Sequence, residues 1–308
     1  MTKPRNMAAS VRYRLADLAR QRGEEFQNLL TRFVIERFLR RLGDSNLRGE
    51  ITLKGANLFR LWCENPHRPT RDLDFLASGE SSIPRVESLV RLICRQKVEE
   101  DGLVFDTESV RGERIREDNI HDGVRVCCVA MLEQARIGLQ IDFGFGDIIT
   151  PGPTEVRFPT ILDFPAPSLA AYSRETVIAE KTHAMVTLGM VNSRMKDFFD
   201  IWFLACAFAF EGKVLQAAIA STFGNRNIGI PPEPPVAFTE QFSENPDKLR
   251  QWAAFLKKGK LDTQGQTFQQ VCGQIGSFLL PPLMSLAHNQ SGPGIWQPKG
   301  PWTDPTHA

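Results

Sequence analysis

The first part of the chain switches between two hydrophobic periods. From Val11 to about Leu42, apolar residues recur at three- and four-residue steps, which is the period of an amphipathic helix. A short apolar run over 51–54 then leads into Gly55, and residues 71–76 alternate strictly, as in a half-buried β-strand. The pattern therefore predicts a helix, a strand, a glycine turn that opens a short helix, and a second strand.

The predicted strand over 71–76 carries two aspartates on one face. Asp72 and Asp74 share that face, while Leu73 and Phe75 share the other. At a rise of about 3.3–3.4 Å per residue, their Cα atoms lie about 7 Å apart. Carboxylates at this spacing can converge on metal ions about 3.5–4 Å apart, as two-metal phosphoryl transfer requires. An Asp-x-Asp pair by itself is more often a solvated strand face or a turn.

The glycine turn adds a second feature of nucleotide chemistry. Gly55 is expected to open a helix whose first N–H groups are unpaired and therefore attract phosphate. A lone glycine before a helix is usually only a backbone requirement. The turn and the Asp-x-Asp pair together favour a nucleotide site more than either does alone.

A third carboxylate follows in the next group of predicted elements. Residues 83–99 have helical periodicity, and Val104–Val110 and Arg125–Leu132 have the pattern of antiparallel strands. The run 137–143 alternates cleanly and places Asp142 on its polar face. This strand could neighbour the Asp-x-Asp strand, which would bring three carboxylates together.

The second half of the chain is mainly helical. Five prolines and weak periodicity over 151–168 indicate a connection between two parts. Beyond it, the helix predicted over Thr176–Gly189 carries Lys181 in the middle of its apolar stripe. Such a lysine either extends its stem so that the ammonium reaches solvent or directs the ammonium into a cleft, where it can meet phosphate.

The run 196–204 is apolar nearly all round and is expected to form a buried helix. Asp197 and Asp200 lie on one side of it, and buried carboxylates need partners. The cations available nearby are Lys181, Arg194 and Lys196. This cluster is as consistent with a structural network as with part of a site.

The remaining pattern completes the predicted division of the chain. Residues 230–235 form a rigid proline-rich linker, 247–258 and 266–287 have helical patterns, and the chain from Asn289 onward has none. We therefore expect three parts: an N-terminal helix with an α/β core over 1–165, a helical domain over 166–288, and an extended tail over 289–308.

Composition narrows the class of protein. The 308 residues are 42% hydrophobic and 24% charged, as in an ordinary soluble domain, and the net charge of +1 gives no global attraction for nucleic acid. Arginines cluster before residue 48 with interleaved glutamates, a pattern typical of a solvated helix face. The six cysteines form no Cys-x-x-Cys pair, and neither a membrane span nor an apolar signal core is present. We expect a reduced, cytoplasmic protein without a zinc site.

Several of these segments, in this order, resemble the AbiEii/AbiGii nucleotidyltransferase toxins of bacterial abortive-infection and toxin–antitoxin systems. The resemblance runs from about residue 25 to 260 and is carried by residues 54–58, 71–75, 141–147, 180–181 and 194–200. It implies an α+β (α/β) protein, with a mixed-sheet core like that of DNA polymerase β followed by a helical domain.

The resemblance also implies an activity. The family uses a nucleoside triphosphate and magnesium, some members modify the acceptor end of tRNA, and members commonly have a separately encoded antitoxin. The residues to which it assigns nucleotide binding are Lys54, Gly55, Ala56, Arg71, Lys181, Lys196, Asp197 and Asp200. The family turn usually reads Gly-Gly or Gly-Ser, whereas Ala56 follows Gly55 here and leaves only backbone donors for phosphate.

The resulting hypothesis is nucleotidyl transfer to RNA. Asp72, Asp74 and Asp142 would hold Mg²⁺, Asp142 could help to deprotonate the acceptor hydroxyl, and Lys181 would neutralise the transferring group. Asp197 and Asp200 would orient that lysine. Transfer to a small molecule predicts a closed pocket without a basic surface, and a non-catalytic interaction protein predicts no metal-dependent binding of triphosphate.

Overall fold

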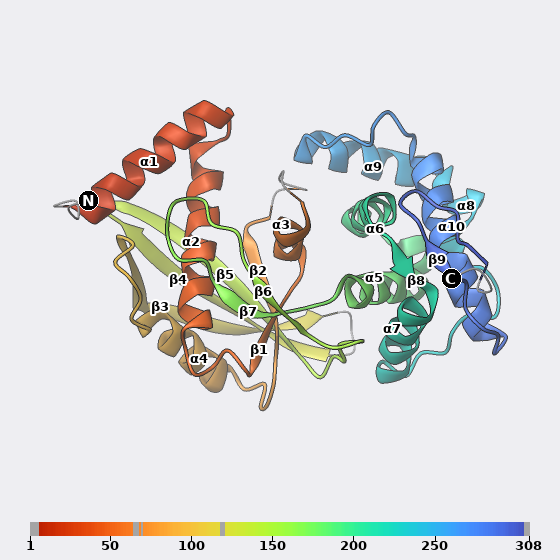
Figure 1. Ribbon diagram of the computed structural model, residues 1–308, viewed down its shortest axis with the longest axis horizontal. Helices are drawn as coiled ribbons and strands as arrows, with labels where there is room; N and C mark the ends of the chain where they lie inside the picture. Colours follow the sequence, from red (N-terminus) through yellow and green to blue (C-terminus); the bar gives the residue numbers. More distant parts are fainter. Residues whose placement is uncertain (1–5, 64–67, 69, 118–120, 305–308) are drawn as a thin grey trace. The chain divides into compact units, whose positions relative to one another are not determined.

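The computed structural model describes residues 6–63, 68, 70–117 and 121–304. It separates into two compact units (Figure 1). Unit 1 comprises Met1–Asp147 and Pro153–Tyr172, and unit 2 comprises Ile148–Gly152 and Ser173–Ala308. The change of unit at Tyr172 falls shortly after the division at residue 165 that the sequence predicts.

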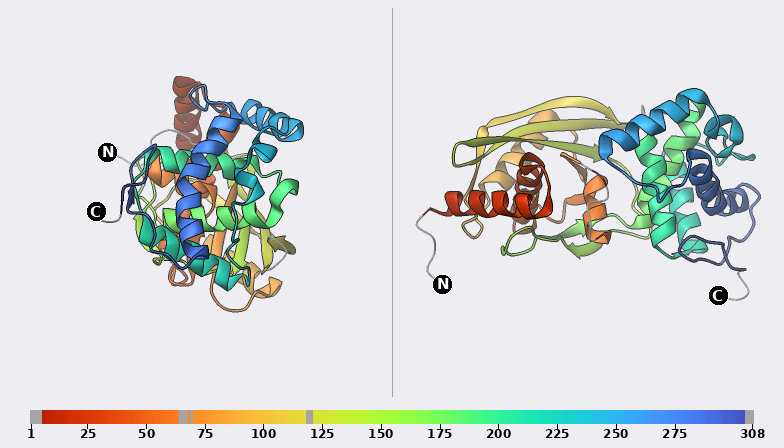
Figure 2. Two further views of the ribbon diagram at one scale, coloured as in Figure 1. Left: turned by 90° about the vertical axis from the view of Figure 1, so that its right-hand side faces the viewer. Right: turned by 90° about the horizontal axis from the view of Figure 1, so that it is seen from above.

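A mixed sheet forms the centre of unit 1, as the sequence predicts. Within the described residues its strand order is β3-β4-β5-β2-β1-β7-β6. The pairs β2–β5 and β1–β7 are parallel and the other pairs are antiparallel. The strands are β1 (Ile51–Lys54), β2 (Asp72–Ala77), β3 (Leu103–Glu117), β4 (His121–Leu132), β5 (Ala135–Phe145), β6 (Thr154–Arg157) and β7 (Ser168–Ala171). The long strands β3 to β5 extend together in the right-hand view of Figure 2.

Two predictions for unit 1 are wrong. The single helix expected from Val11 to Leu42 is two helices, α1 (Met7–Arg22) and α2 (Phe26–Gly43). Gly23 separates them because it adopts a left-handed conformation (φ 63°) and its N–H caps the last carbonyls of α1. The segment 151–168 is more than a connection, since it contains β6 and the start of β7.

The sequence pattern does not predict β6 and β7 because both strands are short and the prolines of this segment lie outside them. β6 and β7 have four residues each, and Leu53 of β1 pairs with Ala171 of β7. A strand of this length gives little alternation to detect, so its pairing partner decides its structure.

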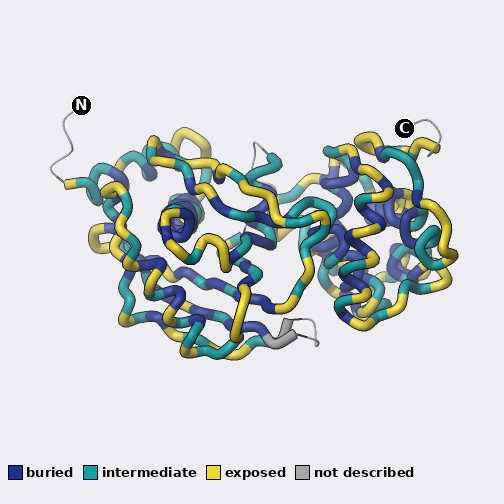
Figure 3. Tube along the Cα trace, turned by 60° about the horizontal axis from the view of Figure 1, so that its bottom comes forward, coloured by how far each residue is buried: buried dark blue, intermediate teal, exposed yellow. Residues whose placement is uncertain are grey.

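The helices of unit 1 cover one face of the sheet. Phe38 of α2 packs on Phe75 of β2 and Phe105 of β3, with ring centroids 6.5 and 5.9 Å apart. Helix α4 (Ile83–Arg95) buries the apolar stripe predicted for it. Leu73, Phe75, Ile141 and Phe143 are each 0% exposed. Buried residues therefore lie inside the unit (Figure 3), and the alternating polar residues of β2 and β5 lie on the face away from these helices.

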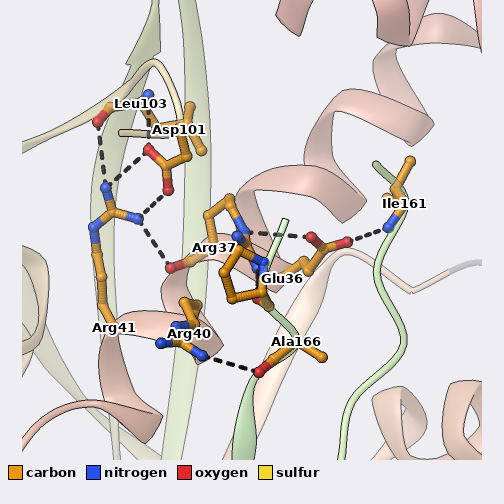
Figure 4. A network of polar contacts seen from close by, with 9 residues as sticks. Glu36, Arg37, Arg40, Arg41, Asp101, Leu103, Ile161 and Ala166 are labelled. Carbon is orange, nitrogen blue, oxygen red and sulfur yellow. Dashed lines mark hydrogen bonds and ion pairs between the residues drawn. The ribbon is translucent and has the colours of Figure 1, made fainter. Parts of the chain in front are cut away.

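Charged side chains of α2 are part of this interior (Figure 4). Glu36 accepts a hydrogen bond from the Ile161 N–H (2.7 Å), and Arg37 Nη2 donates to the Pro165 carbonyl (2.9 Å). Arg41 binds both carboxylate oxygens of Asp101 at 2.7 and 3.1 Å. The expected solvated arginine face is thus wrong here, because these side chains find buried carboxylate and carbonyl partners. They tie α2 to the segment that leads into β7.

Unit 2 is built from helices around an aromatic core. Its helices are α5 (Arg174–Leu188), α6 (Met195–Ala207), α7 (Gly212–Asn225), α8 (Glu240–Ser243), α9 (Pro246–Gly259) and α10 (Phe268–Ala287). The sequence reading did not identify α7. Phe198 of α6, which is 0% exposed, stacks on Phe242 at 5.2 Å. No helix in the described chain is both long and apolar enough to cross a membrane.

The region after residue 289 folds back onto unit 2. Ile295–Trp296 (β9) pairs with Phe210–Glu211 (β8), and the indole N–H of Trp296 donates to the Ala205 carbonyl (2.7 Å). Trp296 is 1% exposed. This part of the chain is therefore irregular but packed into the core.

The network on α2 predicts a pH dependence. Burial raises the pKa of Glu36 from 4.5 to about 7, against the opposing effects of Arg37 and the Ile161 N–H. Between those pH values the folded protein binds more protons than the unfolded chain, so the free energy of unfolding falls as pH rises from about 4.5 to 7. Glu36→Gln should reduce this fall by about 1–3 kcal/mol in denaturant unfolding at pH 5 and 8. The exposed Glu25→Gln serves as control, and an unchanged slope in Glu36→Gln would contradict the assignment.

Candidate active site

A row of charged residues crosses adjacent strands of the sheet in unit 1. Their Cα atoms are paired in the order Glu113 (β3), Arg125 (β4), Asp142 (β5), Asp74 (β2) and Lys54 (β1). Directly paired residues point to the same face of a sheet. The row therefore lies on the face away from the helices and alternates in sign except at its centre, where two aspartates are neighbours.

The two central aspartates are held together by a parallel pair of strands. Asp74 pairs with Asp142 and Asp72 pairs with Gln140, so the strand of Asp142 is the neighbour of the Asp-x-Asp strand, a pairing that the sequence pattern left open. Neighbouring strands are about 4.8 Å apart, which is the spacing of the Asp74 and Asp142 backbones. Asp72 is exposed, whereas Asp74 and Asp142 are half-buried. Two carboxylates this close require cations beside them.

Arg125 supplies one of those cations. It was not among the site residues predicted from sequence. Its Nε donates to Asp142 Oδ1 and its Nη2 to Asp142 Oδ2, both at 2.8 Å. These hydrogen bonds, together with the charges of Asp142 and Asp72, raise the pKa of Arg125. The Gln140 amide, turned so that its oxygen faces the guanidinium, also accepts from Arg125 Nε at 3.1 Å. The guanidinium is thus a bidentate clamp on Asp142.

Lys54 lies at the other end of the row, beside Asp74. Its ammonium is 3.4 Å from Oδ2 of Asp147, the residue that follows the turn after β5, and both side chains are under 8% exposed. The sequence predicts no role for Asp147 beyond a turn position within the family motif. The structure adds it to the candidate site as the carboxylate that fixes a buried lysine next to Asp74.

Gly55 permits this arrangement for a steric reason. It has φ 76° and ψ −159°, and a Cβ at this position would sit 2.0 Å from Asp74 Oδ2. The turn continues as a short 3₁₀ helix, Ala56–Leu58, in which Asn57 Nδ2 donates to the Asp72 carbonyl at 2.7 Å. The turn after β1 therefore fixes the start of β2, and only glycine leaves room for the Asp74 carboxylate.

A second cluster of charged residues lies in unit 2. Lys181 Nζ is 2.5 Å from Asp197 Oδ1 and 2.9 Å from Asp200 Oδ2, and Arg194 Nε donates to Asp197 Oδ2 at 2.7 Å. Both aspartates are 0% exposed. Burial by itself would raise the pKa of Asp197, but the charges of Lys181 and Arg194 lower it below the ordinary value.

This geometry rejects the interpretation of Lys181 as a stem whose ammonium simply reaches solvent. The side chain is 14% exposed and its ammonium contacts two buried carboxylates. Lys196, in the next helix, is exposed, as is Arg71 just before β2, whose Nη2 donates to Asn28 Oδ1 at 3.3 Å. The predicted residues thus fall into two groups, one in each unit.

The carboxylates of unit 1 have the right chemistry for a hard cation. Aspartate oxygens are the ligands that Mg²⁺ prefers, and Asp72, Asp74 and Asp142 share one open face. Among the residues that the structure describes, no three His, Cys, Asp or Glu side chains are already grouped closely enough for a metal ion. Arg125 uses one acceptor site on each oxygen of Asp142, so a metal at this carboxylate would bind through the lone pairs that remain.

Comparison with known proteins identifies the family. Residues 37–273 match the model of the nucleotidyl transferase AbiEii toxin of type IV toxin–antitoxin systems, which is most of the chain. The chain belongs to the AbiEii family. It is therefore a nucleotidyltransferase of the toxin–antitoxin class. No functionally curated protein in the comparison matches it.

Solved structures agree with the fold. One from H. pylori, described as a candidate nucleotidyltransferase, has a TM-score of 0.50 at 14% identity and covers 86% of this chain and 98% of its own. JHP933 from Helicobacter pylori has a TM-score of 0.48 at 14% identity and covers 85% of this chain and 91% of its own. At such identities the first likeness shows that the AbiEii chain has a nucleotidyltransferase fold.

The glycine of the AbiEii turn gives a direct test of the Asp74 geometry. Gly55→Ala should displace the Asp74 carboxylate, because the new Cβ cannot coexist with Oδ2 and the positive φ is strained for alanine. We expect the free energy of unfolding to fall by about 1–3 kcal/mol and activity to fall with it. Gly49→Ala is the control, since its Cβ meets nothing within 4 Å. A Gly55→Ala protein with wild-type stability and activity would contradict this role.

The second cluster predicts a stability effect. Lys181→Met removes the cation that Asp197 and Asp200 share, and breaking a buried ion pair typically costs about 3–5 kcal/mol. In urea unfolding, the free energy of unfolding should therefore fall strongly in this variant and change little in Lys213→Met, where the lysine is exposed. Equal stability of the two variants would show that the cluster does not depend on Lys181.

Proposed function

We propose that this AbiEii protein transfers a nucleotidyl group from a nucleoside triphosphate to the 3′-hydroxyl of an RNA, with tRNA as the acceptor class, in a Mg²⁺-dependent reaction. The observation that carries the proposal is the in-register pair Asp74 and Asp142, with Asp72 on the same open face. Family membership supports a nucleotidyltransferase with a triphosphate donor. The metal and the acceptor are our inference.

Asp72, Asp74 and Asp142 are the residues that would hold Mg²⁺. Bound there, the metal would lower the pKa of the acceptor hydroxyl and neutralise charge on the triphosphate. The acceptor oxygen attacks the α-phosphorus, the bond from that phosphorus to the bridging oxygen breaks, and pyrophosphate leaves. Asp142 could help to deprotonate the acceptor hydroxyl, since Arg125 uses only one acceptor site on each of its oxygens.

Lys54 and Lys181 are proposed to act on the triphosphate. Lys54 is buried beside Asp74, so its charge would offset phosphate near the metal ligands. Lys181 would neutralise the transferring group, and its contacts with Asp197 and Asp200 would hold the ammonium in a fixed direction. The backbone N–H groups of Gly55 and Ala56 would contact the phosphates, with Arg71 and Lys196 as further cations.

The choice of RNA over a small acceptor rests on charge at the carboxylate face. Arg136 is exposed and shares the face of Asp142 in β5. Arg111 is exposed at a position paired with Cys127, next to Gln140 in the neighbouring strand. A basic surface beside the carboxylates suits a phosphate backbone, whereas a small acceptor needs an enclosed pocket. The toxin–antitoxin family also supports a cognate antitoxin protein as partner.

The decisive assay is incubation with total RNA, Mg²⁺ and each α-labelled triphosphate in turn. We expect label in a tRNA-sized band with one triphosphate and none when Mg²⁺ is removed. Label confined to small molecules would replace the RNA acceptor by a small one. Absence of label under every condition would reject the proposal.

Substitution of the carboxylates tests their role in that assay. Asp74→Asn and Asp142→Asn should each lower the rate by about 10²–10³ or more, because they remove charge that acts in the transition state. The matched control is Glu113→Gln, an exposed carboxylate at the end of the same row. Thermal unfolding confirms that each variant is folded. Activity above a few per cent of wild type in either aspartate variant would contradict their assignment.

A further inference from the structure

The open face of unit 1 has a depression next to the proposed metal ligands, and most of the residues that line it have no role in the proposed metal and phosphate contacts. It lies directly beside Asp72 and has a volume of about 280 Å³. Gly138 and Val129 line its floor, and Cys127, Gln140 and Arg71 lie around it. All these residues belong to unit 1.

Gly138 keeps this depression open. It lies in the interior of β5, paired with Val129 of β4, and a Cβ added to it would meet nothing within 4 Å. Its φ is not in the left-handed region, so the backbone does not require glycine. Glycine in a strand interior weakens the strand and often marks a place where a ligand approaches the backbone closely.

The size of the depression and the residues that line it favour a ligand that inserts a flat ring. Its volume falls just below the range of about 300–1,000 Å³ that is typical for small-molecule pockets, so it suits one ring system rather than a whole nucleotide. The Ser109 hydroxyl is already engaged, since it donates to the Asp106 carbonyl and accepts from the Val129 N–H. The Gln140 amide contacts Arg125, and the Arg71 guanidinium donates to Asn28 of α2, so a ring in the depression would lie mainly against the strand backbone at Gly138 and the side chains of Val129 and Cys127.

We propose that the Gly138 depression binds a nucleobase, stacked on the sheet, whose sugar and phosphate extend toward Asp72. The inference rests on the proposed function, since a base bound here belongs to a nucleotide that reacts at the carboxylates. The base comes either from the donor triphosphate or from the 3′-terminal nucleotide of the acceptor. Both present the same chemistry to the sheet, and the experiment distinguishes them.

Cys127 provides a probe within the depression. Cys127 is an exposed cysteine that forms no disulfide. The rate at which iodoacetamide alkylates it is measured by peptide mass analysis, alone, with each nucleoside triphosphate, and with a single-stranded RNA ending in a 3′-hydroxyl. We expect at least fivefold slower alkylation with one of these ligands. Protection by triphosphate assigns the donor base, and protection by RNA assigns the acceptor base.

Gly138→Phe separates stacking in the depression from binding elsewhere. A Cβ at Gly138 meets nothing within 4 Å, so we expect the variant to unfold at a temperature close to that of wild type. We also expect the protection of Cys127 to disappear and the KM of the protecting substrate to rise at least tenfold. Val104→Phe, at a 67% exposed position of β3 outside the depression, is the control and should keep the protection.

The inference is overturned if no ligand slows alkylation of Cys127, or if Gly138→Phe leaves the protection intact. Nucleotidyl transfer by the same preparation is measured in parallel. Protection without transfer would reject the proposed function and leave the base site standing. Transfer without protection would reject the base site and leave the function standing.

Discussion

The parallel pairing of β2 with β5 is the constraint on which the rest of unit 1 depends. It places Asp74 and Asp142 on adjacent strands, where two negative charges at about 5 Å repel unless cations lie beside them. Arg125 and Lys54 occupy the flanking positions of the same row. Gly55 leaves space for the Asp74 carboxylate, and Asn57 fixes the strand at Asp72. These contacts offset the repulsion between the two carboxylates and fix their positions on the open face.

The alternation of apolar and polar residues along β2 and β5 gives the sheet one face that packs on the helices and one face that carries the acids. The residues between the aspartates point to the helices and are fully buried, so β2 and β5 cannot shift by one residue without exposing core and burying acids. The buried charges of α2 hold the chain before β7, and β7 in turn pairs with β1 next to the Gly55 turn. Packing on the face that the helices cover thereby fixes the positions of the polar groups on the opposite, open face.

The sequence predicted the elements with strong periodicity and missed those decided by pairing or by single residues. The strand 51–54 and the alternation of β2 and β5 were readable from sequence, and so was the Asp-x-Asp face. The pairing of Arg125 with Asp142 could not be predicted from sequence. It depends on a two-residue turn between Leu132 and Ala135, whereas the predicted strands left a longer loop at this point. Asp147 gives no periodic signal, and its role appears only in the Lys54 contact.

A crystal structure with Mn²⁺ and a non-hydrolysable triphosphate tests the account most directly. Anomalous scattering locates Mn²⁺ independently of the surrounding atoms. The account predicts a peak at coordination distance from carboxylate oxygens of both Asp74 and Asp142. A peak elsewhere, or bound triphosphate with no peak at these two carboxylates, would contradict it.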